Sequence, residues 1–312
     1  MTTGANNAPL GTLPLMVRVR KDAMKLSAAE RTRFIEAMSI LNNRGAGRFN
    51  QFRDMHRQET LEEAHGADGF LPWHRAYLLD LERELQNVDA SVTLPYWRFD
   101  RPARDVFTRD FLGESNAAGV VQFASTNKLQ FWRTDNGTGV LRRLLFSPAA
   151  SARGDLGPVR TEASTMNDLG TDYGGFIRME GQPHAAAHRS FAEFLSNADT
   201  APRDPLFFLL HCNVDRLWAR WQWLKRRFDP AVPGSFRGSP RPGHRLNDTM
   251  WPWNNDRNPP RPNTAPGGTI APSPVTAAPS PSPAVREMID YQGKTNAAGW
   301  LGFDYDDVPF EP

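Results

Sequence analysis

The chain reads HGADGFLPWHR over residues 65–75 and DPLFFLLHCNVDRLW over residues 204–218. Apolar residues in the second stretch recur every three or four positions, which predicts a helix from about residue 205 to residue 227. In the first stretch, Pro72 suits the N-terminus of a helix, and apolar residues at the same spacing continue from Trp73 to Val88. Both stretches therefore place histidines within or beside amphipathic helices.

Further helices are predicted on either side of these stretches. A capping box that begins at Ser27 opens an amphipathic stretch from Ala28 to Leu41, and another helix should run from about Arg48 to His56. A helix is also expected from about residue 182 to residue 196. Residues 101–175 lack a clear period and indicate loops with short helices or strands. We therefore predict a mainly α fold with a four-helix core, extensive loops and a few short strands.

The composition predicts one large domain followed by a linker and a short C-terminal segment. Pro, Ser, Ala and Thr dominate residues 258–284, and such a segment buries too little apolar surface to offset its ordering entropy. We expect it to be an exposed, extended linker. Residues 1–257 would form the main domain, and residues 285–312 would pack back on its core.

The charge and cysteine content restrict the partners and the compartment. The formal net charge is +2 without a basic stripe, so nothing suggests a nucleic-acid partner. The single cysteine, Cys212, excludes a disulfide within this sequence and is expected to be a small packing residue. No apolar run is long enough for a membrane span, and residues 1–15 do not resemble a secretory signal. We expect a cytoplasmic protein, although export with a helper protein is an alternative.

The seven histidines are unevenly distributed along the chain. Three lie within residues 56–74 and three within residues 184–211, whereas His244 stands in a Pro-rich stretch and is expected to be solvent-exposed. Neutral imidazole is a common ligand of copper and zinc, so two triplets indicate two metal ions. The candidate ligands are His56, His65, His74, His184, His188 and His211.

The second triplet contains two histidines four residues apart. His184 and His188 would project from the same face of a helix, and the three alanines between them leave room for another group. Zinc peptidases carry Glu after the first histidine of such a pair, whereas Ala185 stands here. This difference weighs against peptide hydrolysis, although a zinc hydrolase remains an alternative at this point.

The two opening stretches resemble the copper signatures of tyrosinases and catechol oxidases, which are type-3 dicopper proteins. LPYW at residues 94–97 and GFDY at residues 302–305 also resemble family motifs. The family usually has two consecutive histidines in the second signature; here Leu210 replaces the first, and His211 keeps the ligand position. Some members cross-link a cysteine to the histidine that corresponds to His65, but no cysteine lies nearby in this sequence.

The resemblance implies two copper ions, each held by three histidines, and dioxygen as co-substrate. Such proteins oxidise small o-diphenols to o-quinones, and some also hydroxylate monophenols at the ortho position. Oxidation of o-aminophenols is an alternative. Oxygen carriers use the same copper pair, but the sequence has no obvious lid domain or repeated units, which favours an enzyme.

The resemblance also assigns roles to residues beside the ligands. Glu180 would hold a water that takes or relays the phenol proton, or would simply favour a helix N-terminus. Ala185 stands where several monophenol-hydroxylating members carry Asn, so we expect diphenol oxidation to dominate. Phe207 would pack on a copper-bound imidazole and on the substrate ring.

Other candidates lie further from the predicted copper ions. Arg189 resembles a residue at the pocket rim that could attract carboxylated phenols, or it is a solvated helix charge. Asn213, Asp215 and Arg216 resemble groups that orient the ligands. Asp215 and Arg216 could equally form a structural ion pair.

Overall fold

The computed structural model describes residues 18–43, 48–57, 61–101, 103–134, 137–144, 159–255 and 269–309. The described part of the chain is mainly helical with a few short strands, as predicted. None of its helices is both long enough and apolar enough to cross a membrane.

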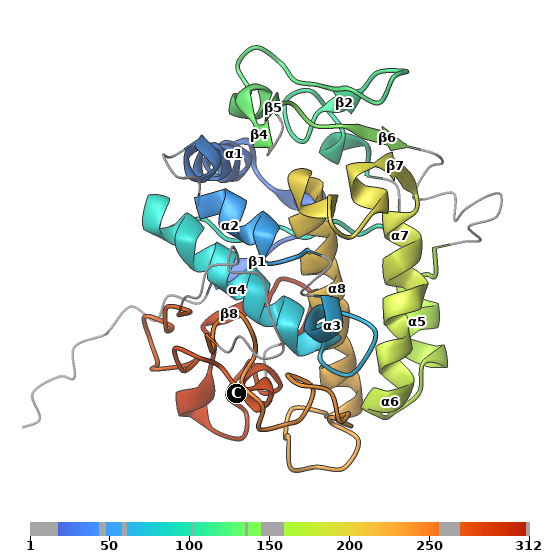
Figure 1. The fold of residues 1–312 in the computed structure, drawn as a ribbon, viewed down its shortest axis with the longest axis vertical. Helices are drawn as coiled ribbons and strands as arrows, with labels where there is room; N and C mark the ends of the chain where they lie inside the picture. The colour runs from blue at the N-terminus through green and yellow to red at the C-terminus, as the bar shows by residue number, and fades with distance from the viewer. Residues whose placement is uncertain are drawn as a thin grey trace, which may run out of the picture.

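Two long helices form the centre of the molecule. α4 (Phe70–Val88) and α8 (Leu206–Lys225) pack against each other, and Figure 1 shows them at the middle of the fold. Most side chains of both helices are buried, because other elements cover them on nearly every side. The two helices predicted from the opening sequence stretches are therefore confirmed to within a few residues.

Shorter helices cover one side of α4. α1 (Ala28–Asn43) packs against α4 and α2 (Arg48–Asp54), and α3 (Leu61–Ala64) precedes α4. The capping box predicted at the start of α1 is present: the Ser27 N–H donates to Glu30 Oε2 (2.9 Å), and the Glu30 N–H donates to Ser27 Oγ (3.3 Å). The sequence pattern therefore located the start of this helix correctly.

A column of short helices lies beside α8 (Figure 1). It consists of α5 (Glu162–Asp168), α6 (Tyr173–Phe176) and α7 (Ala186–His188), and a π-helical turn at Gly181–Ala185 leads into α7. This column brings His184 and His188 toward the central helices.

The helix predicted over residues 182–196 is wrong beyond His188. The chain instead forms strand β7 (Phe191–Glu193) and a 3-10 turn at Phe194–Ser196. Glu193 has a φ of 70°, a left-handed conformation that a right-handed helix does not contain. The apolar spacing after His188 therefore reflects burial in a turn.

The strands are short and pair two by two. β1 (Arg18–Arg20) runs parallel to β8 (Phe303–Tyr305), and in this register Arg20 is opposite Tyr305. Three antiparallel pairs gather at the top of the molecule in Figure 1, whereas β1 and β8 lie near its middle. They are β2 (Glu114–Ser115) with β3 (Val121–Gln122), β4 (Arg133–Thr134) with β5 (Gly137–Thr138), and β6 (Arg142–Leu144) with β7. The remaining 3-10 helices are Ala23–Lys25, Arg104–Val106, Lys128–Phe131, Ile177–Glu180, Ala201–Arg203, Val285–Met288 and Ala297–Gly299.

The segment predicted as an exposed linker packs on the core where it is described. Residues 256–268 lie outside the described residues. After them, Ile270 is buried, and the Ser282 hydroxyl donates to the Trp253 carbonyl (2.7 Å). Full exposure of residues 269–284 is therefore wrong, because scattered apolar side chains and hydrogen bonds to the core hold this extended stretch in place. The domain boundaries themselves stay a prediction.

A buried ionic network joins the beginning, the middle and the end of the chain. Asp215 on α8 accepts hydrogen bonds from Arg75 Nε (2.6 Å), Arg20 Nη1 (3.1 Å) and the Tyr305 hydroxyl (2.6 Å). Glu82 on α4 also pairs with Arg20, with 2.9 Å between Nη2 and Oε2. Because buried charges are tolerated only when they are paired, this network requires α4, α8, β1 and β8 to come together.

Candidate metal centre

Six histidines converge between the central helices. Those of the first half come from the turn after α2, the loop before α4 and α4 itself, and those of the second half come from the turn before α7, α7 and α8. The rings of His74 and His211 stack with centroids 4.3 Å apart, so the two halves meet. In chain order the residues are His56, His65, His74, His184, His188 and His211. The structure therefore brings all predicted ligands together.

Hydrogen bonds at Nδ1 orient most of these rings. The Nδ1 atoms of five rings lie 2.8–3.0 Å from oxygen atoms that can only accept a hydrogen bond. Each of these Nδ1 atoms therefore carries the hydrogen, and each Nε2 carries a lone pair. The pairs are His56 with Ala198 O, His65 with Glu180 Oε1, His74 with Phe70 O, His184 with Glu180 O, and His188 with Leu195 O.

The lone pairs face one another across a small space. His56 Nε2 lies 2.9 Å from His65 Nε2, although both nitrogens are acceptors in this arrangement. The Nε2 atoms of His74 and His184 are buried and have no hydrogen-bond partner among the described residues. Such an arrangement is unfavourable unless a cation lies between the nitrogens. The donor set therefore fits metal ions that prefer imidazole, among them copper.

The geometry does not divide the histidines as simply as the sequence did. Ring nitrogens of His56, His74 and His211 lie within 4.8 Å of one another, and so do those of His184, His188 and His211. The two sets share His211, and His65 reaches the first set through its contact with His56. The assignment of three particular ligands to each ion therefore stays a prediction.

Burial keeps the rings in the form that binds metal. Desolvation lowers the pKa of His188 to about 4, and it holds the pKa values of four other histidines of the cluster well below their ordinary range. Neighbouring imidazoles act in the same direction. A neutral imidazole has a lone pair for a metal ion, so the buried cluster is prepared for metal binding near neutral pH. The other rings with a strongly lowered pKa are those of His56, His74, His184 and His211.

A hollow of about 230 Å³ lies over the histidines. The side chains of His65 and Glu180 are 19% and 21% exposed, so the hollow reaches solvent. Ala185 lines it, and Arg189 lies exposed at its rim. The family resemblance predicted that both residues belong to a substrate pocket. The other lining residues are His56, His184, His188, Leu195, Ser196 and Ala198.

Glu180 contacts the loop that carries His65. Its Oε1 accepts hydrogen bonds from His65 Nδ1 (3.0 Å) and from the Gly66 N–H (2.8 Å). This carboxylate therefore holds one imidazole ring directly, a role that the sequence did not indicate. The proposed role of Glu180 toward a water molecule stays a prediction.

Phe207 packs beneath the imidazoles. Its buried ring lies with its centroid 4.3 Å from that of His211 and 5.0 Å from that of His56. The expected contact with an imidazole is present. Phe207 is not among the residues that line the hollow, so its expected contact with the substrate stays a prediction.

The three residues expected to orient the ligands bond elsewhere. Arg216 donates to Asn213 Oδ1 (3.2 Å) and to Asp307 Oδ1 (2.7 Å), while Asp215 belongs to the buried ionic network. None of the hydrogen bonds of these three side chains within the described structure goes to a histidine. Asp215 and Arg216 form ion pairs with other residues and not with each other, and the expected orienting role of the three residues stays a prediction.

His244 is buried, and the prediction that it is solvent-exposed is wrong. Its Nδ1 accepts a hydrogen bond from the Gly69 N–H (3.0 Å), and its Nε2 donates to the Glu62 carbonyl (2.8 Å). Because the Pro-rich stretch around it packs on the loop before α4, the local composition misled the prediction. No motif in the sequence marks this contact.

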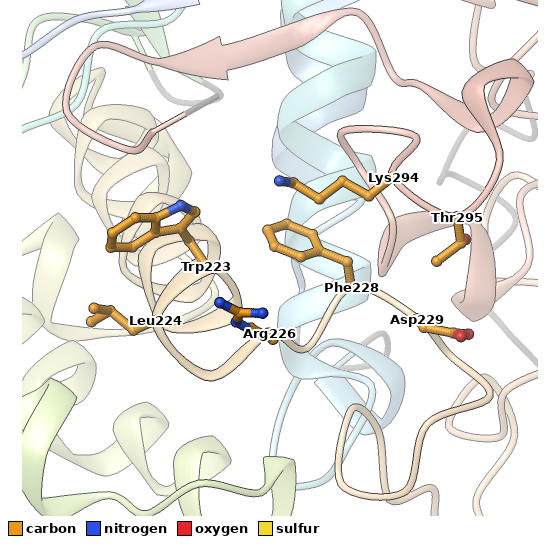
Figure 2. A pocket seen from close by; sticks show the side chains of 7 residues that line it. All are labelled: Trp223, Leu224, Arg226, Phe228, Asp229, Lys294 and Thr295. Atoms are coloured by element: carbon orange, nitrogen blue, oxygen red, sulfur yellow. The ribbon is translucent and has the colours of Figure 1, made fainter. Parts of the chain in front are cut away.

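A larger hollow, of about 490 Å³, lies at the C-terminal end of α8. Figure 2 shows Trp223 and Phe228 on either side of it, with the Arg226 guanidinium between them and the Lys294 amine near Phe228. None of its lining residues is a histidine. Size alone therefore does not locate the metal centre, whereas the convergence of unpaired ring nitrogens does.

Residues 46–224 match the family described as tyrosinase, common central domain. Tyrosinase from Streptomyces antibioticus is 33% identical over 265 residues, a match that covers 76% of this chain and 93% of the relative. The chain belongs to the tyrosinase family. A second tyrosinase, from Streptomyces glaucescens, is also 33% identical and covers 76% of this chain and 92% of its own length.

Solved structures show the same fold for this tyrosinase-family protein. Hemocyanin from Rapana thomasiana superposes with a TM-score of 0.64 at 22% identity, over 94% of this chain and 70% of that chain. A polyphenol oxidase variant from Thermothelomyces thermophila gives a TM-score of 0.59 at 19% identity, over 93% and 88%. The six-histidine centre of this tyrosinase-family chain thus lies in a fold that both enzymes and hemocyanins use.

Proposed function

We propose that this protein is a copper-dependent phenol oxidase that uses dioxygen to convert o-diphenols into o-quinones. The observation that carries the proposal is the set of opposed Nε2 lone pairs beneath a hollow that reaches solvent. The tyrosinases to which the chain is similar support it. When bound, two copper ions would supply the redox chemistry with dioxygen: each diphenol gives up two electrons and two protons, so two diphenols reduce one O2 to two molecules of water.

The residues of the hollow would bind and orient a small phenol. Its volume of about 230 Å³ is below the roughly 300–1,000 Å³ of many small-molecule sites, which favours a single-ring substrate. Among the described residues, both hydrogen bonds to the Glu180 carboxylate go to Oε1, which leaves Oε2 available for a water or for the phenol proton. Arg189 at the rim would attract a substrate carboxylate.

An oxygen carrier is the second candidate, because hemocyanins share the fold. A carrier binds dioxygen reversibly, whereas an oxidase consumes it in proportion to the phenol. Partial exposure of His65 and Glu180 gives a phenol access to the centre, which favours the oxidase. An oxygen electrode measurement on copper-loaded protein with 4-methylcatechol decides between the two: we expect continuous oxygen consumption, and uptake that stops near one O2 per copper pair would contradict the proposal.

Ala185 leads to a prediction about substrate preference. Its methyl group cannot hydrogen-bond a water beside Glu180, so proton removal from a monophenol lacks support. We expect initial rates on 4-methylcatechol to exceed those on 4-methylphenol by at least about 100-fold. Ala185→Asn should raise the monophenol rate by about ten-fold or more and leave the diphenol rate within about two-fold.

Ser196→Asn provides the matched control, since it adds the same amide at another lining position. It should leave the ratio of the two rates unchanged. Comparable rates on the two phenols in the natural protein, or equal effects of the two Asn variants, would refute the role assigned to Ala185.

A further inference from the structure

The loop that carries His65 is held by a segment far away in the sequence. The His244 ring is buried between the two ends of this loop: it accepts a hydrogen bond from the Gly69 N–H (3.0 Å) and donates one to the Glu62 carbonyl (2.8 Å). His65 lies between these two backbone groups, three residues after Glu62 and four before Gly69. One side chain therefore fixes the loop on both sides of a candidate copper ligand.

The fit between the two segments is tight. A Cβ atom on Gly69 would lie 3.0 Å from the His244 ring and 2.9 Å from the Glu63 carbonyl oxygen. Gly243 has a φ of +74°, and a Cβ atom there would lie 2.6 Å from the Glu63 carboxylate. The Trp251 N–H donates to the same carboxylate (2.9 Å). Glycine is thus required on both sides of the contact, as expected where backbones must approach closely.

The two hydrogen bonds need an imidazole in one particular form. An acceptor at Nδ1 and a donor at Nε2 occur together only in a neutral ring with its hydrogen on Nε2. Burial, the largest influence, lowers the pKa of His244 and favours this neutral form. The amide of Asn reaches only as far as Nδ1 and could replace the acceptor there. The longer side chain of Gln reaches the position of Nε2 and could replace the donor, so the two bonds can be tested separately.

We propose that His244 is a positioning residue that holds His65 at the metal centre through Gly69 and Glu62. It would thereby determine how firmly the protein retains one of its two copper ions. This inference rests on the ligand role of His65 in the proposed function. The Glu180 carboxylate holds His65 directly, so Glu180 and His244 hold this loop through separate contacts.

The loop has other contacts that should keep it folded when His244 is replaced. The Tyr173 hydroxyl donates to the Asp68 carbonyl (2.6 Å), and Arg237 pairs with the Asp68 carboxylate (2.7 Å). We therefore expect His244→Ala to loosen residues 62–69 without unfolding the protein.

The first measurement is amide hydrogen exchange in the copper-free full-length protein. We expect His244→Ala to speed exchange of residues 62–70 about ten-fold or more, since two buried hydrogen bonds are lost. His244→Asn should restore protection of the Gly69 amide better than His244→Gln does. Ser282→Ala is the matched control, because it also removes one side-chain bond to a carbonyl but contacts Trp253 instead of the loop.

The second measurement is the number of copper ions retained per chain during dialysis against a chelator. We expect His244→Ala to lose its first copper about ten-fold faster than the natural protein, with the second copper lost at nearly the natural rate. Ser282→Ala should retain both. His65→Ala, measured in parallel, should retain no more than one copper; if it retains two, the proposed ligand set fails independently of the role of His244.

Three results would overturn the inference. In the first, exchange of residues 62–70 is unchanged in His244→Ala. In the second, exchange rises but both copper ions are retained as in the natural protein. In the third, Ser282→Ala produces the same changes as His244→Ala, which would show general destabilisation.

Discussion

Burial decides the chemistry of single side chains near the centre. Cys212 follows His211 directly, but neighbouring residues of a helix point about 100° apart, and its thiol lies 3.6 Å from the Leu94 carbonyl, to which it donates. Burial raises the pKa of the Cys212 thiol to about 12. The side chain is therefore a packing residue, as the sequence suggested, and does not join the ring nitrogens.

This environment predicts an unreactive thiol. At pH 8 the native protein should react with a soluble aromatic disulfide reagent at least about 100-fold more slowly than the protein in denaturant does, because attack needs an exposed thiolate. Absorbance of the released thiol measures both rates. Rapid modification of the folded protein would show that Cys212 is accessible.

Asp304 is a buried carboxyl with an unusual titration. Its Oδ1 accepts hydrogen bonds from the Tyr305 N–H (2.8 Å) and the Tyr291 hydroxyl (3.2 Å), yet burial raises its pKa from 3.8 to about 6. Because the folded pKa is raised, ionisation is less favourable in the folded protein than in the unfolded chain. The contribution of this carboxyl to stability is therefore greatest at low pH and falls as the pH rises from about 4 through about 6.

The consequence can be measured with Asp304→Asn. Below about pH 3 the stability difference between the two proteins should not change with pH. Between pH 4 and pH 7 the natural protein should lose about 2 kcal/mol relative to the variant. Urea unfolding at several pH values gives this difference, and a constant difference across the whole range would contradict the raised pKa.

At the scale of elements, the central helices depend on a few buried charges. Asp215 links α8 to Arg75 on α4 and to Arg20 on β1. Glu82 also pairs with Arg20, so the two carboxylates of the network balance its two guanidinium groups. Removal of one member leaves its partners charged and buried, which costs more than the loss of an exposed pair.

We expect Asp215→Asn to lower the free energy of unfolding by about 3–5 kcal/mol. The matched control is Glu30→Gln, which removes one charge of the partly exposed Lys21–Glu30 pair while keeping a side chain suited to the capping box. It should change stability by less than about 1 kcal/mol. Denaturant unfolding measures the free energy of unfolding of both variants. Similar losses in the two would show that the network stabilises the fold no more than a single partly exposed ion pair does.

The sequence predicted the long helices well and the short strands poorly. α4 and α8 extend over many turns, so their apolar period was clear, and the histidine spacing along them predicted a metal centre. Strands of two or three residues are shorter than any readable period. The carbonyls of Ala198 and Leu195 that orient histidines also have no signature, because any residue supplies a carbonyl. The role of His244 was missed for a related reason: it depends on which distant backbone lies against it.

At the scale of the whole molecule, segments far apart in the sequence complete one another. β1 near the start of the described chain pairs with β8 near its end, and residues 269–309 cover the lower side of α4 and α8 in Figure 1. The Tyr305 hydroxyl reaches Asp215 at the centre. The segment that the sequence divided off as linker and C-terminal piece thus contributes to the same core.

This arrangement predicts that the copper-free protein unfolds in a single step. Tryptophan fluorescence and far-ultraviolet circular dichroism should give coincident urea transitions, with midpoints that agree within about 0.2 M. Tyr305→Phe should shift both transitions together, since it removes two hydrogen bonds from the central network, one to Asp215 and one from Arg20. Two separated transitions would show that the C-terminal segment forms an independent unit.

The pairing of β1 with β8 has a consequence for biosynthesis. A ribosome delivers Arg20 early and Tyr305 almost three hundred residues later, so α8 lacks this partner until long after its own synthesis. Between the synthesis of His211 and that of Tyr305, all six candidate ligands are present, but α8 lacks its contact with β8. Metal acquisition by the mature centre should therefore follow the synthesis of residues 303–305.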